Sequence, residues 1–269
     1  MTTQDYYNIE ADENGWRELP NGNKFKLGVH CIIGDGAYIG NNAYTCNNVA
    51  IGNGAYIGDG VNIGNNALIG NKVVIGYRAR IGIGAYIGDG VNIGNNALIG
   101  YKSTIGNCTV IGDGAYIGDG AKIGDGAYIG KGVNIGNNAY TCNNVAIGNG
   151  AYIGNKVVIG NWVKIGNKVT IGKYASIGDG VYIGNGARIH NYAKIDDGAT
   201  IDDDVSVSNN DKTTYLVTVI NSAGDYLEHK LFKSLIEAEQ CAKGFGSHCT
   251  IEIWTRVSSN LIQKFNYLG

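Results

Sequence analysis

The sequence is poor in proline, methionine and histidine, and these scarcities limit what the chain can be. Its 269 residues include one proline (Pro20), one methionine and four histidines. None of the six cysteines forms a C-x-x-C pair, so we expect no zinc site. Nothing in the residue pattern indicates another metal site or a cofactor.

An excess of charge of either sign is also missing. The formal net charge is −2 and the isoelectric point is about 6.1, whereas nucleic-acid-binding domains carry clustered basic residues. The segment Met1–Tyr7 has neither a basic start nor an apolar run. We therefore expect no nucleic-acid partner, no signal peptide and no membrane segment. These absences predict a cytoplasmic protein with reduced cysteines.

What the sequence does contain is glycine, 44 residues of it, and a strict period of six. From Leu27 to Val207 every sixth residue is isoleucine at all but four of 31 positions, and no insertion breaks the phase. The four exceptions are Leu27, Thr45, Thr141 and Val207. A period of six is neither the helix nor the strand period, so the chain is read first as an internal repeat.

The repeat unit is I-G-[N/D]-x-[A/V]-x, and we label its isoleucine position i. Position i+4 is small or β-branched, i+5 varies, and i+1 to i+3 are rich in Gly, Asn and Asp. Side chains alternate across a strand. A short strand over i+4, i+5 and i therefore points the two apolar positions inward and i+5 outward. The Gly and Asn residues between them suit a sharp corner.

These repeats resemble the hexapeptide-repeat family, whose fold is a left-handed parallel β-helix with three units in each triangular coil. The resemblance implies about ten coils over residues 27–207, with residues 18 apart stacked on one face. At the usual strand spacing the prism would be roughly 48 Å long. Such an array needs a cap at each end.

The outward i+5 residues predict a surface for self-association. Two of the three faces carry no charge over their first five and seven positions, which suggests a contact surface. The residues predicted to form it are Ile32, Tyr38, Ala50, Tyr56, Leu68, Val74, Tyr86 and Val110. Proteins with this helix commonly form trimers, so the resemblance favours a homotrimer. The alternative is that tyrosine and β-branched residues simply suit strands.

One block, N-N-A-Y-T-C-N-N-V-A-I-G, occurs twice, starting at Asn41 and Asn137. The offset of 96 residues is a multiple of 6 but not of 18. The two copies are therefore expected on different faces, which indicates duplication of sequence rather than a site kept on one face.

Members of this family carry two kinds of histidine site, a catalytic site for acyl transfer and a zinc site. Many members are acyltransferases with a catalytic histidine near a subunit interface, often beside a loop that bulges from a coil. This array has no such loop, and its histidines are His30 and His190, each at a corner. His190 is the one catalytic candidate, with a solvated corner residue as the alternative. Members that bind zinc through three histidines need them on nearby coils, but about nine coils separate His30 from His190.

Outside the array, residues 1–26 are expected to cap the prism, residues 208–212 to form a linker, and residues 213–269 to form a small α+β domain. The predicted order is ββαββ, with strands at 215–220, 226–232, 249–257 and 261–268 and a helix from Ser234 to about Lys243. Trp254 could be a partner hot spot if exposed. Surface positions are expected for His229 and His248.

The fold class predicted from the sequence is therefore an all-β left-handed parallel β-helix with a short N-terminal cap and a small C-terminal α+β domain. The favoured function is non-enzymatic: a rigid self-associating rod that displays residues 213–269 to a protein partner. The alternative is a hexapeptide-type acyltransferase with its site between subunits. A third hypothesis is a virus-type accessory or inhibitor protein that binds a host protein.

Overall fold

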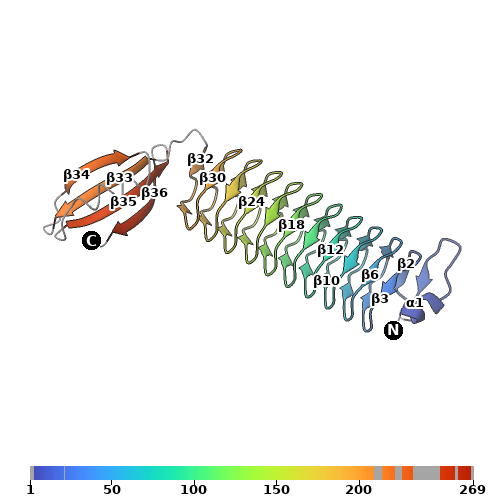
Figure 1. The fold of residues 1–269 in the computed structure, drawn as a ribbon. Helices are drawn as coiled ribbons and strands as arrows, with labels where there is room; N and C mark the ends of the chain where they lie inside the picture. Colours follow the sequence, from blue (N-terminus) through green and yellow to red (C-terminus); the bar gives the residue numbers. More distant parts are fainter. Residues whose placement is uncertain are drawn as a thin grey trace.

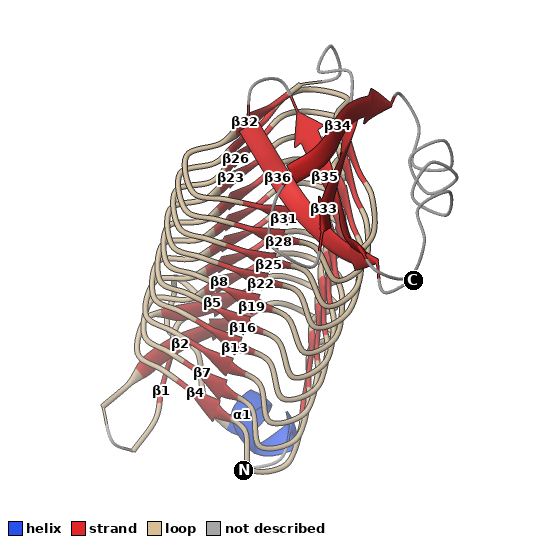
Figure 2. Ribbon diagram, turned by 90° about the vertical axis from the view of Figure 1, so that its left-hand side faces the viewer, coloured by secondary structure: helices blue, strands red, loops and turns tan. Residues whose placement is uncertain are grey.

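The computed structural model shows a straight β-solenoid of about ten triangular coils (Figure 1). It describes residues 3–20, 22–208, 214–221, 226–232, 249–257 and 260–267, the last four ranges through their backbone alone. Three parallel sheets run along the solenoid, one on each side of the prism. Figure 2 shows the coils from an oblique angle, stacked one above the next from the end with α1 (Thr3–Asn8) to β32 (Ser206–Val207).

Each sheet takes every third strand of the chain, so paired residues are 18 apart, as predicted. Sheet A begins with an antiparallel pair and continues in parallel. Its strands are β1 (Arg17–Glu18), β2 (Lys24–Leu27), β5 (Ala43–Thr45), β8 (Asn62–Ile63), β11 (Arg80–Ile81), β14 (Leu98–Ile99), β17 (Tyr116–Ile117), β20 (Asn134–Ile135), β23 (Tyr152–Ile153), β26 (Thr170–Ile171), β29 (Arg188–Ile189) and β32 (Ser206–Val207).

Sheets B and C have ten strands each. Sheet B contains β3 (Ile32–Ile33), β6 (Ala50–Ile51), β9 (Leu68–Ile69), β12 (Tyr86–Ile87), β15 (Thr104–Ile105), β18 (Lys122–Ile123), β21 (Tyr140–Thr141), β24 (Val158–Ile159), β27 (Ser176–Ile177) and β30 (Lys194–Ile195). Sheet C contains β4 (Tyr38–Ile39), β7 (Tyr56–Ile57), β10 (Val74–Ile75), β13 (Asn92–Ile93), β16 (Val110–Ile111), β19 (Tyr128–Ile129), β22 (Ala146–Ile147), β25 (Lys164–Ile165), β28 (Tyr182–Ile183) and β31 (Thr200–Ile201).

Most strands are one residue shorter than the repeat predicted, because position i+4 belongs to the corner. The amide of Ala37, for example, donates to the carbonyl of Gly34 at 3.2 Å instead of joining the ladder. Its side chain nevertheless points inward, as do the isoleucines, which are buried along the whole array. Each buried isoleucine contributes roughly 1.5–3 kcal/mol before conformational entropy is subtracted.

Two corner positions are set by backbone geometry. At i+3 every residue from His30 to Asp204 has a positive φ, including 17 that are not glycine. At i+1 glycine predominates because the next coil lies against it: a Cβ on Gly94 would come within 2.5 Å of the amide nitrogen of Asp113. The corner sequence therefore follows from coil stacking as well as from turn preference.

The residues at i+2 form a hydrogen-bonded ladder along each edge of the prism. The side-chain Oδ1 of Asn or Asp accepts the backbone N–H of the residue at i+2 in the preceding coil, as from Asp89 to Asn107 at 2.8 Å and from Asn107 to Asp125 at 2.6 Å. Where another residue type occupies i+2, as at Ile83, this acceptor is missing. These exposed corners, predicted as sharp turns, thus also bond one coil to the next.

The start of the described chain packs on the first coil. Helix α1 (Thr3–Asn8) carries Tyr6, which is buried, meets Phe25 edge-on and donates its hydroxyl to the carbonyl of Ala37 at 2.8 Å. Tyr7 donates to the carbonyl of Gly28 at 2.9 Å. Burial raises the pKa of the Tyr6 phenol above its ordinary value, so the hydroxyl stays protonated and able to donate at neutral pH.

At the other end, four antiparallel strands form sheet D in the order β34-β33-β35-β36. They are β33 (Thr214–Asn221), β34 (Tyr226–Phe232), β35 (Cys249–Val257) and β36 (Asn260–Tyr267). The predicted hairpin turn at 221–225, beyond Asn221, and the predicted helix from Ser234 to Lys243 lie outside the described residues. Within the described part of the chain, no helix has the length and apolarity needed to cross a bilayer.

Candidate functional site

His190 follows strand β29 and lies at the corner between sheets A and B in the last coil. It occupies the i+1 position, and its backbone N–H donates to the carbonyl of Val207 at 2.8 Å. The imidazole is exposed, and its Nε2 lies 2.9 Å from the hydroxyl oxygen of Ser206. The catalytic candidate of the sequence therefore has a hydrogen-bonding partner in the neighbouring strand.

Ser206 is the outward residue of β32, the last strand of sheet A. It is paired in register with Arg188 of β29, so a guanidinium group and a serine hydroxyl are neighbours on this face. The pairing with His190 could not be anticipated from sequence spacing alone. The two residues are 16 apart and meet only because a coil is 18 residues long.

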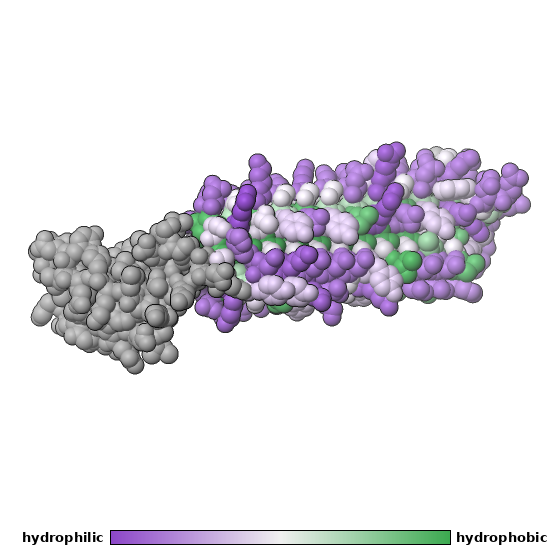
Figure 3. Space-filling view, turned by 90° about the horizontal axis from the view of Figure 1, so that it is seen from above, coloured by the Kyte–Doolittle hydropathy of each residue, from purple (hydrophilic) through white to green (hydrophobic). Residues whose placement is uncertain are grey.

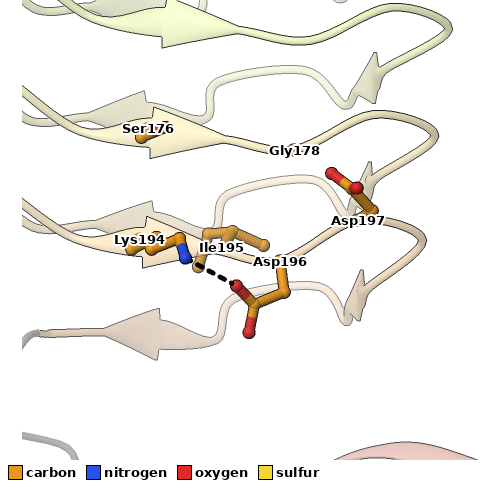
Figure 4. A pocket seen from close by; sticks show the side chains of 6 residues that line it. All are labelled: Ser176, Gly178, Lys194, Ile195, Asp196 and Asp197. Atoms are coloured by element: carbon orange, nitrogen blue, oxygen red, sulfur yellow. Dashed lines mark ion pairs between the residues drawn. The ribbon is translucent and has the colours of Figure 1, made fainter.

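A shallow open hollow of about 420 Å³ lies on the adjacent sheet B, one corner away from His190. Figure 4 shows its lining: Ser176, Gly178, Lys194, Ile195, Asp196 and Asp197. Lys194 Nζ lies 3.4 Å from Asp196 Oδ1, and Asp197 Oδ1 accepts the amide N–H of Asp179 at 2.8 Å. The hollow thus offers a hydroxyl, an amine and two carboxylates to a polar ligand.

Aromatic rings stack at the corner that carries His190. Tyr174 and Tyr192 are parallel, with ring centroids 4.9 Å apart, and Lys156 Nζ lies 5.2 Å from the Tyr174 centroid. Both tyrosines have positive φ and expose much of their surface. The last three coils therefore combine a histidine, a serine, a flat aromatic surface and a polar hollow.

The residues of the predicted contact surface lie on the two sheets to which the 18-residue period assigns them. Ile32, Ala50, Leu68 and Tyr86 are on sheet B, and Tyr38, Tyr56, Val74 and Val110 are on sheet C. Ile32 is 63% exposed, and Tyr56, Leu68 and Tyr86 are each 47% exposed. Figure 3 shows apolar residues in rows between rows of polar ones along the rod. The contact itself remains a prediction.

The other sequence candidates do not join a site with His190. His30 follows β2 at the opposite end of the solenoid. Trp254 lies in β35, where its backbone pairs with Leu216 and Lys264, and its side chain is outside the described atoms. In the part of the chain with described side chains, no group of three or more His, Cys, Asp or Glu residues could hold a metal ion.

The solenoid defines the class of protein: a left-handed parallel β-helix. Family models match its repeats in three stretches. The model of the bacterial transferase hexapeptide (six repeats) matches residues 108–143 and 163–197, and that of the hexapeptide repeat of succinyl-transferase matches residues 72–101. The repeat array belongs to the hexapeptide-repeat family, as the sequence indicated.

A solved structure shows the same fold. An Arabidopsis UDP-N-acetylglucosamine acyltransferase aligns with a TM-score of 0.59 at 18% identity, over 82% of this chain and 76% of that chain. The Bacteroides fragilis enzyme LpxA, also a UDP-N-acetylglucosamine acyltransferase, gives a TM-score of 0.48 at 21% identity, over 78% and 77% of the two chains.

The acetyltransferase domain of PglB from Neisseria gonorrhoeae, solved with acetyl coenzyme A, gives a TM-score of 0.37 at 20% identity, over 42% of this chain and 55% of that chain. No curated protein sequence matches the chain.

These findings overturn the favoured interpretation of the sequence, a non-enzymatic structural or protein-binding rod. The family models that match describe transferases, and the solved structure that shares the fold with a TM-score of 0.59 is an acyltransferase. The interpretation was wrong because an array without a bulging loop and with only two histidines still matches the transferase hexapeptide models. The findings favour the alternative, an acyltransferase.

Proposed function

We propose that this protein is a hexapeptide-type acyltransferase that uses His190 in a site between subunits. The match of the bacterial transferase hexapeptide model to residues 163–197 carries the proposal, because this segment contains both His190 and the hollow on sheet B. A smooth prism offers a deep cleft only where a second subunit closes it, and His190 is exposed at a corner where such a cleft could form.

In this proposal His190 acts as a general base. A neutral imidazole takes the proton from the group that attacks the acyl carbonyl and gives it to the group that leaves. The acyl donor is a thioester, so its C–S bond breaks and the sulfur departs as a thiol once it has received the proton. Members of the family use acyl-CoA or acyl carrier protein, so these are the donor classes proposed here.

The acceptor proposed for a first test is UDP-N-acetylglucosamine, on which the Arabidopsis relative acts. The polar lining of the hollow is compatible with such a ligand, because Ser176, Asp196 and Asp197 present hydroxyl and carboxylate oxygens that bind sugar hydroxyls.

The oligomer proposed is a homotrimer joined through the outer faces of sheets B and C in the N-terminal half. The exposed Ile32, Tyr56, Leu68 and Tyr86 support this choice, since contiguous apolar surface favours association. We further propose residues 1–26 as an N-terminal cap and residues 213–269 as a small α+β domain open to a protein partner through Trp254. The cytoplasmic location also stays a prediction.

The test is turnover of purified full-length protein with UDP-N-acetylglucosamine and a panel of acyl-CoA and acyl carrier protein donors. We expect His190→Ala to lower kcat by roughly 10²- to 10⁴-fold, the usual effect of removing a general base. His30→Ala, a corner histidine at the opposite end of the array, is the matched control and should keep full activity. Equal activity of wild type and His190→Ala would contradict the assignment.

Solution mass by light scattering tests the assembly. A trimer for both the full chain and residues 1–210 is expected if the array drives association. A monomer with full activity would exclude a site between subunits.

A further inference from the structure

The contact between Ser206 and His190 pairs a hydroxyl with a base, which is the arrangement of an activated nucleophile. We propose that Ser206 accepts the acyl group from the donor as a covalent ester before the group passes to the acceptor. This inference rests on the proposed acyltransferase function and gives it a two-step course.

The sheet fixes the spacing of the pair. Val205 and Val207 flank Ser206, and their carbonyls accept the amides of Arg188 and His190, each at 2.8 Å. Both sides of the contact are therefore held by ladder hydrogen bonds, and Ser206 Oγ remains 2.9 Å from His190 Nε2. Among the residues with described side chains, no third group bonds the other ring nitrogen, so the pair is a dyad.

The position of β32 supplies a further donor. In earlier coils the amide of the outward residue donates to the next coil, as Thr170 donates to Ala187 at 2.9 Å and Arg188 to Val205 at 2.8 Å. Strand β32 ends sheet A, and the amide of Ser206 has no acceptor within the described part of the chain. This N–H lies next to the nucleophile, where it can stabilise the oxyanion of a tetrahedral intermediate.

Arg188 adds charge complementarity. Its side chain is exposed on the same face and is one strand away from Ser206, about 4.8 Å along the rod. A guanidinium group binds phosphate oxygens in a bidentate manner. A donor that carries phosphate groups would therefore be attracted to the coil that carries the nucleophile.

The chemistry balances in two transfers. In the first, Ser206 Oγ bonds to the acyl carbon, the C–S bond breaks, and the serine proton moves through His190 to the thiolate. In the second, the acceptor hydroxyl or amine attacks the Ser206 ester, and His190 returns the acceptor proton to Ser206 Oγ. No oxidant, reductant or metal is needed.

The experiment exposes the full-length protein, without acceptor, to p-nitrophenyl acetate and to any thioester donor that supports turnover. The first probe does not depend on donor specificity. Leaving-group release is followed by absorbance, and the acylated residue is found by mass spectrometry of peptides after an acid quench. Variants are Ser206→Ala, His190→Ala and Thr170→Ala. Thr170 is the matched control, because it is an outward hydroxyl on sheet A with an occupied amide.

We expect an acyl group on Ser206, its loss in Ser206→Ala and His190→Ala, and its retention in Thr170→Ala. Turnover should fall by roughly a hundredfold or more in Ser206→Ala. Full turnover in Ser206→Ala, or an unlabelled Ser206, would overturn the covalent step. If wild type acetylates Ser206 from p-nitrophenyl acetate but transfers to no acceptor, the proposed function fails while the nucleophile stands.

Discussion

At the scale of single residues, the corners carry backbone strain that the repeat tolerates. Seventeen non-glycine residues at i+3 have φ near +55°, among them Trp162 (φ 60), Lys168 (φ 56) and Tyr174 (φ 60). A left-handed conformation costs an L-residue about 1–2 kcal/mol relative to the right-handed one. Glycine occupies the equivalent position in other coils, as at Gly180 and Gly186. The corner residues are therefore not at their stability optimum.

Replacing Lys168 by glycine is expected to stabilise the protein by about 0.5–1 kcal/mol. The left-handed strain is relieved, and the larger unfolded-state entropy of glycine, about 0.4–1 kcal/mol, offsets part of the gain. The measurement is the thermal unfolding midpoint by circular dichroism. Lys168→Ala is the control, because alanine keeps the strain. An equal gain in both variants would mean that removal of the lysine side chain, not the backbone, is responsible.

For the corner glycine at i+1, the sequence predicted the turn but not the main reason for glycine. The repeat predicted a corner from glycine's conformational freedom, but the stronger constraint is the close approach of the next coil. This constraint explains the change of composition at the end of the array. Asp196 and Asp202 stand in place of corner glycine in the last coil, where β30 and β31 end sheets B and C. No further coil continues those sheets, so a side chain has room.

At the scale of elements, the edges of the prism contribute to its stability together with the core. The ladders of Asn and Asp bond most corners to the preceding one, whereas most strands are only two residues long. A corner amide that lacks a ladder acceptor must bond to water. The ladders therefore add direct links between coils on the outside of the hydrophobic stack.

Asn149→Ala is expected to destabilise the protein by about 0.5–1.5 kcal/mol, the usual net contribution of a hydrogen bond. Asn149 Oδ1 accepts the amide N–H of Lys131 at 2.7 Å, and alanine removes this acceptor. Asn149→Asp keeps an acceptor beside a lysine and should leave stability nearly unchanged. Unfolding in urea with constant m-value compares the three proteins. Equal loss in both variants would show that the ladder contact is not what stabilises the corner.

Ile83→Asn is the reciprocal change. Asparagine would give the Asn65 amide an acceptor that it lacks among the described residues, so a gain of about 0.5–1.5 kcal/mol is expected. A loss of stability would mean that Ile83, which is 47% exposed, makes a contact in the assembled protein.

The sequence predicted the strands and which of their side chains point inward or outward. Through the family resemblance it also predicted the stacking of residues 18 apart. It did not predict the ladders, because i+2 residues alternate among Asn, Asp, Lys and Tyr and resemble an ordinary polar edge. Nor did it predict the dyad, because Ser206 is outward in the final strand and carries no motif. The candidate His190 came from the family resemblance, which implies a catalytic histidine, and from its being one of only two histidines in the array.

At the scale of the whole molecule, the three faces are interchangeable because every unit fills the same shape. Deleting residues 109–126 removes one full coil, and deleting residues 109–114 removes a single unit. Both deletions keep the inward phase, so both proteins are expected to fold, with similar circular dichroism spectra. In the single-unit deletion, however, every later strand moves to another sheet.

These two variants test whether both halves of the rod must be aligned for function. Removing one coil should shorten the rod by about 4.8 Å and preserve trimerisation and turnover. Removing one unit should preserve folding but turn His190 and Ser206 a third of a turn away from the N-terminal contact surface, which should abolish turnover. Mass, small-angle scattering and activity are measured in parallel. Full turnover after the single-unit deletion would place the complete site within the last coils.

The block repeated at Asn41 and Asn137 carries Thr45 on sheet A but Thr141 on sheet B. A copying slip of one unit in the coding sequence is therefore expected to leave the fold intact: it keeps the reading frame, preserves the core and presents every downstream side chain in a new direction. Gain or loss of single units can thus change the surface of the protein during evolution while the protein still folds. In a lineage of such proteins, length and surface orientation should vary long before the buried isoleucines do.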